Sequence, residues 1–123
     1  LKRFKSRFKW YKNINSPKKI MNSFDVLICT SINESLPLSI IESLSMSIPV
    51  ISTNVGDISH VLNKKKCGLI VNPNASDFIN VIKKLNTDKE KMMEYSINAR
   101  NNIFKNFNIV NYKKKLEKEI FIP

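Results

Sequence analysis

Two glutamates separated by eight positions are the residues of this 123-residue sequence whose types and spacing best suit ligand binding. Glu34 lies in a polar stretch, and Glu42 lies in a segment whose apolar spacing predicts a helix. Carboxylates accept paired hydrogen bonds from neighbouring hydroxyl groups, so a loop glutamate and a helix glutamate can hold one ligand between them. Taken alone the pair is weak evidence, because acidic side chains are usually solvated surface residues.

The same stretch predicts a helix terminus that attracts anions. Pro37 can open a helix over residues 37–47, because its fixed φ suits the first helical turn. Pro37 has no N–H to offer, so it contributes geometry only. The N–H groups of Leu38 and Ser39 would be free to bind an anion, and the helix dipole adds to the attraction.

Three short apolar runs predict the strands that carry these residues. Residues 24–30 (FDVLICT) form a nearly continuous apolar run, which is typical of a strand buried on both faces of a parallel sheet. Residues 49–52 and 69–71 predict two further strands. Strands that alternate with helices indicate an α/β fold, here an incomplete doubly wound sheet of three or four strands with an open edge. Ligands bind beyond the carboxyl ends of such strands, where the loops 31–37 and 53–57 lie.

Helices are predicted between and after the strands. They cover residues 16–21, 37–47, 58–62, a segment that Asn74 and Asp77 begin in capping-box style, 89–105 and 108–121. Residues 64–68 predict a basic turn. The apolar spacing assigns an inward face to four of the helices. These faces are Leu38, Ile41, Leu44 and Ser45; Phe78, Val81, Ile82 and Leu85; Met93, Ile97, Ile103 and Phe104; and Ile109, Tyr112, Leu116 and Ile120.

The formal net charge of +11 is concentrated near the two ends of the chain, within residues 2–12 and 113–118. A basic balance raises the affinity for nucleic acid, anionic lipid or a nucleotide, although runs of lysine are usually solvated. Phe4, Phe8 and Trp10 interleave with the first cluster, and such aromatics suit stacking on bases or anchoring at a membrane interface. A basic binding module for anionic lipid or nucleic acid is therefore an alternative function.

Cysteine usage and hydropathy indicate in which compartment the protein works. Cys29 and Cys67 show no metal or redox spacing, which favours two reduced thiols in a cytosolic protein. No apolar run approaches the roughly 18–20 residues that a membrane-spanning helix needs. No motif for binding a metal is present, so we expect no metal site.

The stretch from Ser31 to Asn74 resembles the family 4 glycosyltransferases of the GT-B fold, which has two Rossmann-like domains. Their signature is a serine, a short loop, E-x7-E on a loop and helix, a Pro-Val segment, a glycine turn, and a Gly-Leu segment that ends near a proline. The residues in register are Ser31, Glu34, Glu42, Pro49, Val50, Gly56, Gly68, Leu69 and Pro73. The resemblance covers roughly residues 8–121, and both glycines of the chain fall where the family places one.

The resemblance implies a retaining transfer of a sugar from a nucleotide diphosphate sugar to a glycan or lipid-linked acceptor, as in polysaccharide biosynthesis. It implies no metal and no cofactor, because the nucleotide sugar is the donor substrate. It assigns Glu34 to the donor sugar as the catalytic residue and Glu42 to the ribose hydroxyls. The other donor-binding residues that it implies are Leu38 and Ser39, whose amides bind the diphosphate, and Ser31 and Gly56.

Parts of the family pattern are replaced or missing. Ser47 stands where glycine is usual, so a non-glycine residue must end the helix at a modest steric cost. The arginine and lysine that neutralise the diphosphate, and the acceptor-binding N-terminal domain, have no counterpart here. We therefore expect residues 1–123 to be the C-terminal part of a nucleotide-sugar-binding domain, inactive alone. The resemblance implies a hexosyltransferase-like enzyme. From the cysteine usage and the basic charge we expect it in the cytoplasm, in peripheral contact with the anionic inner face of a membrane.

Overall fold

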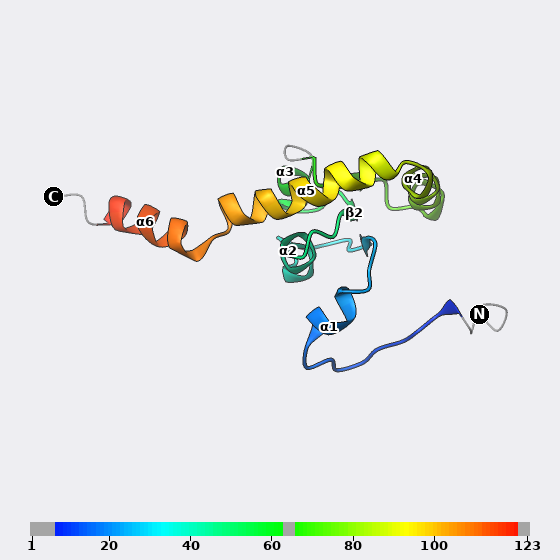
Figure 1. Ribbon diagram of the computed structural model, residues 1–123, viewed down its shortest axis with the longest axis horizontal. Helices are drawn as coiled ribbons and strands as arrows, with labels where there is room; N and C mark the ends of the chain where they lie inside the picture. Colours follow the sequence, from blue (N-terminus) through cyan, green and yellow to red (C-terminus); the bar gives the residue numbers. More distant parts are fainter. Residues whose placement is uncertain (1–6, 63–65, 121–123) are drawn as a thin grey trace.

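The computed structural model describes residues 7–62 and 66–120, in which helices alternate with three short strands (Figure 1). In chain order the elements are α1 (Pro17–Met21), β1 (Leu27–Cys29), α2 (Leu38–Ser45), β2 (Val50–Thr53), α3 (Ile58–Leu62), β3 (Gly68–Val71), α4 (Ala75–Thr87), α5 (Lys89–Asn106) and α6 (Ile109–Ile120). None of these helices combines the length and the apolar character that crossing a membrane requires. Residues 64 and 65 of the predicted basic turn lie outside the described residues.

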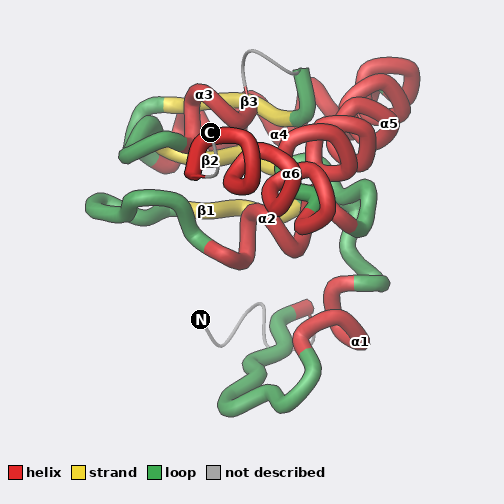
Figure 2. The backbone as a smooth tube through the Cα atoms, turned by 90° about the vertical axis from the view of Figure 1, so that its left-hand side faces the viewer, coloured by secondary structure: helices red, strands yellow, loops and turns green. Residues whose placement is uncertain are grey.

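The strands form one parallel sheet in the order β1-β2-β3, which confirms the predicted α/β class (Figure 2). Val50 of β2 pairs with Leu27 on one side and with Gly68 on the other. A Cβ atom added at Gly68 would lie 2.2 Å from the carbonyl oxygen of Val50, so the close approach of β2 and β3 requires glycine there.

Alternate residues of β2 enter two separate cores on the two faces of the sheet. Val50 packs with residues of α2 and α3 on one face, and Ile51 packs with residues of α4 on the other. Helix α5 contributes to both cores, through Tyr95 on the α4 side and Ala99 on the α2 side. The sheet is therefore covered on both faces at its central strand, as a doubly wound fold requires.

The prediction that the first strand is buried on both faces is wrong. Strand β1 is shorter than predicted, and Ile28 at its centre is 44% exposed. Leu27 and Cys29 pack against the core that contains α2, so Ile28 points to the opposite face. Over the described residues no helix covers β1 on that face, and no strand pairs with its outer edge. The open edge predicted from the sequence is thus present beside β1.

Two predicted helix faces, those of α2 and α5, are only partly correct. Leu38, assigned to the interior, is 77% exposed at the start of α2, whereas Leu44 is buried as predicted, together with Ile40 and Ser43. In α5 the assigned residue Phe104 is 73% exposed, whereas the assigned residue Ile103 packs against the core as predicted. The assigned Met93 and Ile97 are exposed as well, whereas the buried residues of α5 are Tyr95, Ala99 and Asn102.

The buried face of α5 is set by its close packing on α2. Ala99 is fully buried there, and its small side chain lets the two helices approach. The Ser96 hydroxyl donates a 2.6 Å hydrogen bond to the carbonyl oxygen of Ser47. Ser47 adopts a φ of +64° just after α2, so the strained residue predicted at this helix end is present and is held by α5.

Helix α6 has no buried residue, and in Figure 1 it extends away from the sheet. The face predicted to point inward, formed by Ile109, Tyr112, Leu116 and Ile120, is exposed. Its periodicity is that of an amphipathic helix, but the described residues provide nothing for the apolar side to pack against.

The Asn74 cap of α4 allows a direct test of the fold. Its side-chain oxygen accepts a 2.9 Å hydrogen bond from the Asp77 N–H, as the sequence predicts. Replacing this cap, Asn74→Ala, is expected to lower the free energy of unfolding by about 1 kcal/mol, measured by urea denaturation. Asn101→Ala on the exposed side of α5 is the matched control, because it removes an amide that caps no helix. Equal losses in the two variants would contradict the assignment of the cap.

Candidate functional site

Five of the six predicted site residues lie on one continuous segment, the loop that leaves β1 and the helix α2 that follows it. Ser31 is half-buried directly beyond β1, and Glu34 is exposed in the loop. Leu38 and Ser39 are the first two residues of α2 and are exposed. Glu42 is half-buried one turn further along α2. The structure therefore places all of these residues at the carboxyl end of the sheet, where ligands of α/β folds bind.

Two hydrogen bonds, one from the end of β2 and one from the turn after it, hold the loop that carries Glu34. The Thr53 hydroxyl donates to the carbonyl oxygen of Ser31 over 2.5 Å, and the Asp57 N–H donates to the carbonyl oxygen of Ser35 over 2.9 Å. The Thr53 side chain is buried, and the hydrogen bond itself is partly buried. The loop is therefore held at Ser31 by β2 and at Ser35 by the turn that follows β2.

Gly56, predicted as a donor contact, packs against the backbone of the same loop. It adopts a φ of +50°, in the left-handed region that favours glycine. A Cβ atom added there would lie 2.3 Å from the carbonyl oxygen of Glu34 and 2.1 Å from that of Ser35. The absence of a side chain is thus what lets the Glu34 loop lie at its observed position. A contact between Gly56 and the donor stays a prediction.

The N-terminus of α2 is open, unlike those of the neighbouring long helices. The first turns of α4 and α5 are capped by the side chains of Asn74 and Asp88. Pro37 occupies the corresponding position of α2 and makes no such bond. Within the described part of the chain, the N–H groups of Leu38 and Ser39 donate no hydrogen bond to protein atoms. They are therefore available to an anion.

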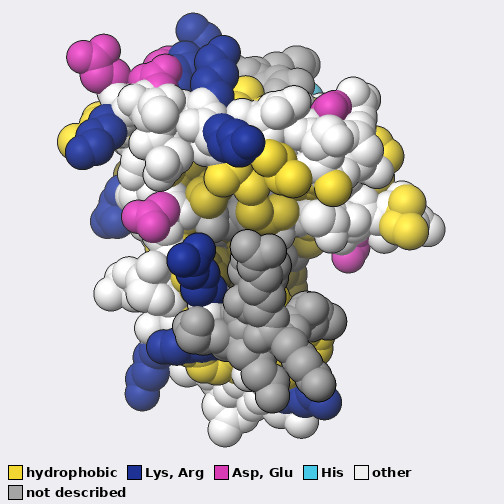
Figure 3. All heavy atoms as spheres, turned by 90° about the vertical axis from the view of Figure 1, so that its right-hand side faces the viewer, with side chains coloured by type: hydrophobic (Ala, Val, Ile, Leu, Met, Phe, Trp, Pro, Cys, Tyr) yellow, Lys and Arg dark blue, Asp and Glu magenta, His cyan; other side chains and the backbone are white. Residues whose placement is uncertain are grey.

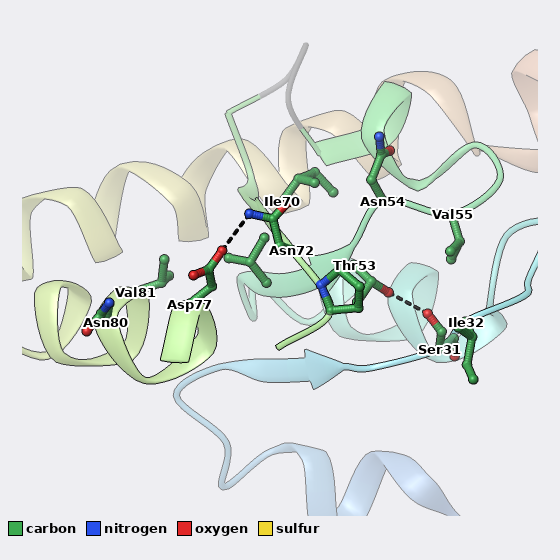
Figure 4. Close-up of a pocket in the computed structure, with 12 residues that line it drawn as sticks. Ser31, Ile32, Thr53, Asn54, Val55, Ile70, Asn72, Asp77, Asn80 and Val81 are labelled. Carbon is green, nitrogen blue, oxygen red and sulfur yellow. Dashed lines mark hydrogen bonds between the residues drawn. The ribbon is translucent and has the colours of Figure 1, made fainter. Parts of the chain in front are cut away.

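A pocket of about 550 Å³ opens beside this loop, over the carboxyl ends of all three strands (Figure 4). We name it the amide pocket, and its lining residues are Ser31, Ile32, Thr53, Asn54, Val55, Ile70, Val71, Asn72, Pro73, Asp77, Asn80 and Val81. Ser31 and Ile32 lie at one end and the α4 residues Asp77 and Asn80 at the other (Figure 4). Ser31 is the only predicted site residue in the lining, so the pocket adjoins the open end of α2 without including it.

A second hollow lies at the opposite end of the strands, far from the predicted site. It has a volume of about 630 Å³, and its lining includes Val26 and Pro49, which precede β1 and β2, and Met92 of α5. In Figure 3, which views the end of the molecule that carries α4 and the start of α5, hydrophobic side chains gather in the middle of the face. Because ligand sites of α/β folds lie at the carboxyl ends of strands, the amide pocket is the better candidate.

The resolved pKa shifts concern α5 and lie outside the predicted site. The hydrogen bond between Lys91 and Glu94, 2.8 Å long, raises the pKa of Lys91 and lowers that of Glu94. Burial raises the pKa of Tyr95. In residues 7–62 and 66–120, no group of three or more His, Cys, Asp or Glu side chains is arranged to hold a metal ion.

The sequence interpretation placed the loop 53–57 at the ligand end of the sheet, but Ser31 is the one side chain of the amide pocket that it named as a site residue. Thr53 belongs to that loop at the end of β2, and Asn72 stands at the end of β3, where the same rule would have selected it. Asp77 was interpreted only as a capping residue, although its carboxylate also accepts a 2.7 Å hydrogen bond from the side chain of Asn72. Asn80, one turn further along α4, carried no sequence signal.

Comparison with solved structures agrees with this architecture. The chain aligns with a glycosyltransferase from Rickettsia africae with a TM-score of 0.83 and 23% identity, over 96% of this chain and 33% of that one. It aligns with an Anabaena protein, solved in complex with UDP-glucose, with a TM-score of 0.69 and 20% identity, over 83% of this chain and 29% of that one. At these identities the likeness concerns the fold.

Comparison of sequences identifies the family. The chain is 31% identical over 109 residues to the Escherichia coli UDP-Gal:alpha-D-GlcNAc-diphosphoundecaprenol alpha-1,3-galactosyltransferase. That match covers 88% of this chain and 28% of the relative, so the chain spans less than a third of that relative's length. The model of the family described as glycosyl transferases group 1 matches residues 3–102. This chain, with its parallel sheet and the open terminus of α2, therefore belongs to the group 1 glycosyl transferases.

Proposed function

We propose that this chain is the part of a retaining glycosyltransferase that binds the nucleotide diphosphate sugar. The diphosphate lies at the N-terminus of α2, on the N–H groups of Leu38 and Ser39. Glu42 accepts hydrogen bonds from the ribose hydroxyls, and Glu34 contacts the sugar that is transferred. Ser31 and Gly56 border the same site.

The observation that carries this proposal is the uncapped terminus of α2 between two glutamates. An uncapped helix N-terminus attracts an anion through its free N–H groups and the helix dipole. Glu34 is exposed just before the helix, and Glu42 lies on it. Carboxylates repel a diphosphate but accept hydrogen bonds from hydroxyl groups, so they suit the ribose and the sugar on either side of it.

The names of similar proteins support the same class of donor and acceptor. The E. coli relative takes UDP-Gal as donor and a diphosphoundecaprenol-linked sugar as acceptor, and the Anabaena structure contains UDP-glucose. We infer that this chain serves a transferase that uses a nucleotide sugar and a glycan or lipid-linked acceptor. We also propose that the transfer retains configuration, needs no metal or cofactor, and uses this chain as the C-terminal part of the donor-binding domain. These three points are based on the match to the E-x7-E signature.

Comparing UDP, UMP and uridine as ligands of the chain tests the proposal. The second phosphate adds charge-assisted hydrogen bonds at the α2 terminus, each worth about 1.5–3 kcal/mol. We therefore expect UDP to bind roughly tenfold to a hundredfold more tightly than UMP, and uridine to bind least, in equilibrium dialysis. Equal affinity for the three ligands would show that no diphosphate site is present.

We also propose that the transferase works in the cytoplasm, in peripheral contact with the anionic inner face of a membrane. Trp10 is 71% exposed, and its ring lies 6.2 Å from that of Phe8, close in sequence to Lys9 and Lys12. Exposed aromatic rings beside lysines suit a membrane interface.

Screening by salt makes that contact testable. Binding to phosphatidylserine vesicles should be weak and should fall steeply between about 0.05 and 0.5 M salt, because the Debye length shrinks from over 10 Å to a few ångströms. Deletion of residues 1–12 should abolish it, measured by vesicle co-sedimentation. Tight binding that survives both high salt and the deletion would contradict an electrostatic contact.

A further inference from the structure

The charged groups around the amide pocket do not favour a phosphate. Among residues 7–62 and 66–120, no lysine or arginine lines this pocket. Its charged lining residue is Asp77, whose carboxylate would repel a phosphate. The pocket therefore disfavours the anionic part of a nucleotide sugar.

Its polar groups match a ligand that is neutral and rich in hydroxyl groups. Asn54, Asn72 and Asn80 each carry a side-chain amide that both donates and accepts hydrogen bonds. The 2.7 Å hydrogen bond from Asn72 orients the carboxylate of Asp77, so this acceptor is already in place before a ligand binds. Paired donors and acceptors of this kind suit adjacent hydroxyl groups.

The apolar lining and the size of the pocket agree with the same ligand. Ile70, Val81 and Pro73 add aliphatic surface next to the amides, which suits the C–H face of a sugar ring. The volume of about 550 Å³ lies within the range of small-molecule sites, roughly 300–1,000 Å³. Ser31 and Ile32 belong both to the pocket and to the loop that carries Glu34.

We propose that the amide pocket binds a neutral, hydroxylated sugar ring beside the reaction centre. The ring belongs either to the acceptor or to the sugar of the donor, since both offer the same hydroxyl groups. This inference rests on the proposed function, because it takes Glu34 as the position of the reacting sugar.

The test is a ¹⁵N NMR titration of the 123-residue chain, because each asparagine side chain gives its own amide signals. Methyl α-D-galactopyranoside and methyl α-D-glucopyranoside serve as neutral probes, up to about 100 mM, since a lone sugar ring binds in the millimolar range. We expect at least one of them to shift the side-chain signals of Asn72 and Asn80 and to leave that of Asn101 on α5 unmoved. If the Asn72 and Asn80 signals stay unmoved with both probes and also with UDP-galactose, the proposal is overturned.

Matched variants check that the shifts report binding in the pocket. Asn80→Leu keeps the size of the side chain and removes its hydrogen bonds, so it should weaken binding of the glycoside about threefold to tenfold. Asn101→Leu makes the same change on the exposed side of α5 and should leave the affinity unchanged. Equal weakening by both variants would also overturn the proposal.

Two further ligands, UDP and UDP-galactose, show whether the ring belongs to the donor or to the acceptor. They also distinguish a failure of the pocket proposal from a failure of the proposed function. UDP-galactose that moves the Asn80 signal beyond the effect of UDP identifies the donor sugar as the occupant. A glycoside that moves it while UDP-galactose is bound identifies an acceptor ring. UDP alone should shift the backbone amides of Leu38 and Ser39. If it does so while neither UDP-galactose nor a glycoside reaches Asn80, the pocket proposal fails and the donor site stands. If UDP leaves Leu38 and Ser39 unmoved, the donor site itself fails.

Discussion

Replacing Glu42 by glutamine is expected to weaken donor binding by about tenfold to a hundredfold. The neutral amide keeps the shape of the side chain but loses charge-assisted hydrogen bonds to the ribose hydroxyls, each worth roughly 1.5–3 kcal/mol. Because the chain spans 28% of its E. coli relative, the donor KM and Kd are to be measured in a transferase that carries this segment together with the remaining length.

Glu34→Gln, in the same transferase, is expected to lower kcat more than it raises the donor KM. Its proposed contact is with the transferred sugar, where charge develops as the bond to the diphosphate breaks. Folding should change little, because Glu34 is exposed and Glu42 is half-buried. Glu119→Gln on the exposed helix α6 is the matched control and should behave as the wild type. Wild-type kinetics in both site variants would contradict the assignment.

Gly56→Ala is expected to lower kcat at least about tenfold while the protein remains folded. The left-handed φ of +50° costs a residue with a Cβ atom roughly 1–2 kcal/mol. The added carbon would also meet the carbonyl oxygens of Glu34 and Ser35 at 2.3 and 2.1 Å, so the loop must move away. A displacement of about 1 Å in a catalytic group costs up to a hundredfold in rate.

The control for Gly56→Ala is a change at the next residue that adds no atom against the loop. Asp57→Ala keeps the backbone N–H that donates to the carbonyl oxygen of Ser35, so its kcat should change far less. Thermal unfolding and kcat are to be measured on both variants, with the kinetics recorded well below the unfolding temperature. Wild-type kcat in Gly56→Ala would show that the packing of Gly56 does not position Glu34.

Local signals in the sequence were sufficient for the elements that carry the site. The fixed φ of Pro37 and the apolar run before Ser31 predicted a helix that starts beyond the first strand. The cap of α4 by Asn74 was also predictable, because its hydrogen bond to Asp77 spans only three residues. These features depend on near neighbours in the chain, and the structure places them where the pattern predicts.

Contacts between distant segments were beyond the sequence pattern. Apolar periodicity put Met93 and Phe104 of α5 inside, but the helix turns Ala99 towards α2, where only a small side chain allows the two helices to approach. Gly56 is 22 positions from Glu34, and nothing local indicates that its missing side chain makes room for that loop. The amide pocket likewise forms only when the ends of three strands meet.

A crystal structure of the donor complex tests the central claim most directly. In a transferase that carries this segment, bound to its nucleotide diphosphate sugar, we expect phosphate oxygens within about 2.7–3.2 Å of the Leu38 and Ser39 nitrogens. The carboxylate of Glu42 should accept hydrogen bonds from the ribose hydroxyls, and Glu34 should contact the sugar. A diphosphate bound in the amide pocket, or at the opposite end of the strands beside Val26 and Pro49, would contradict the account.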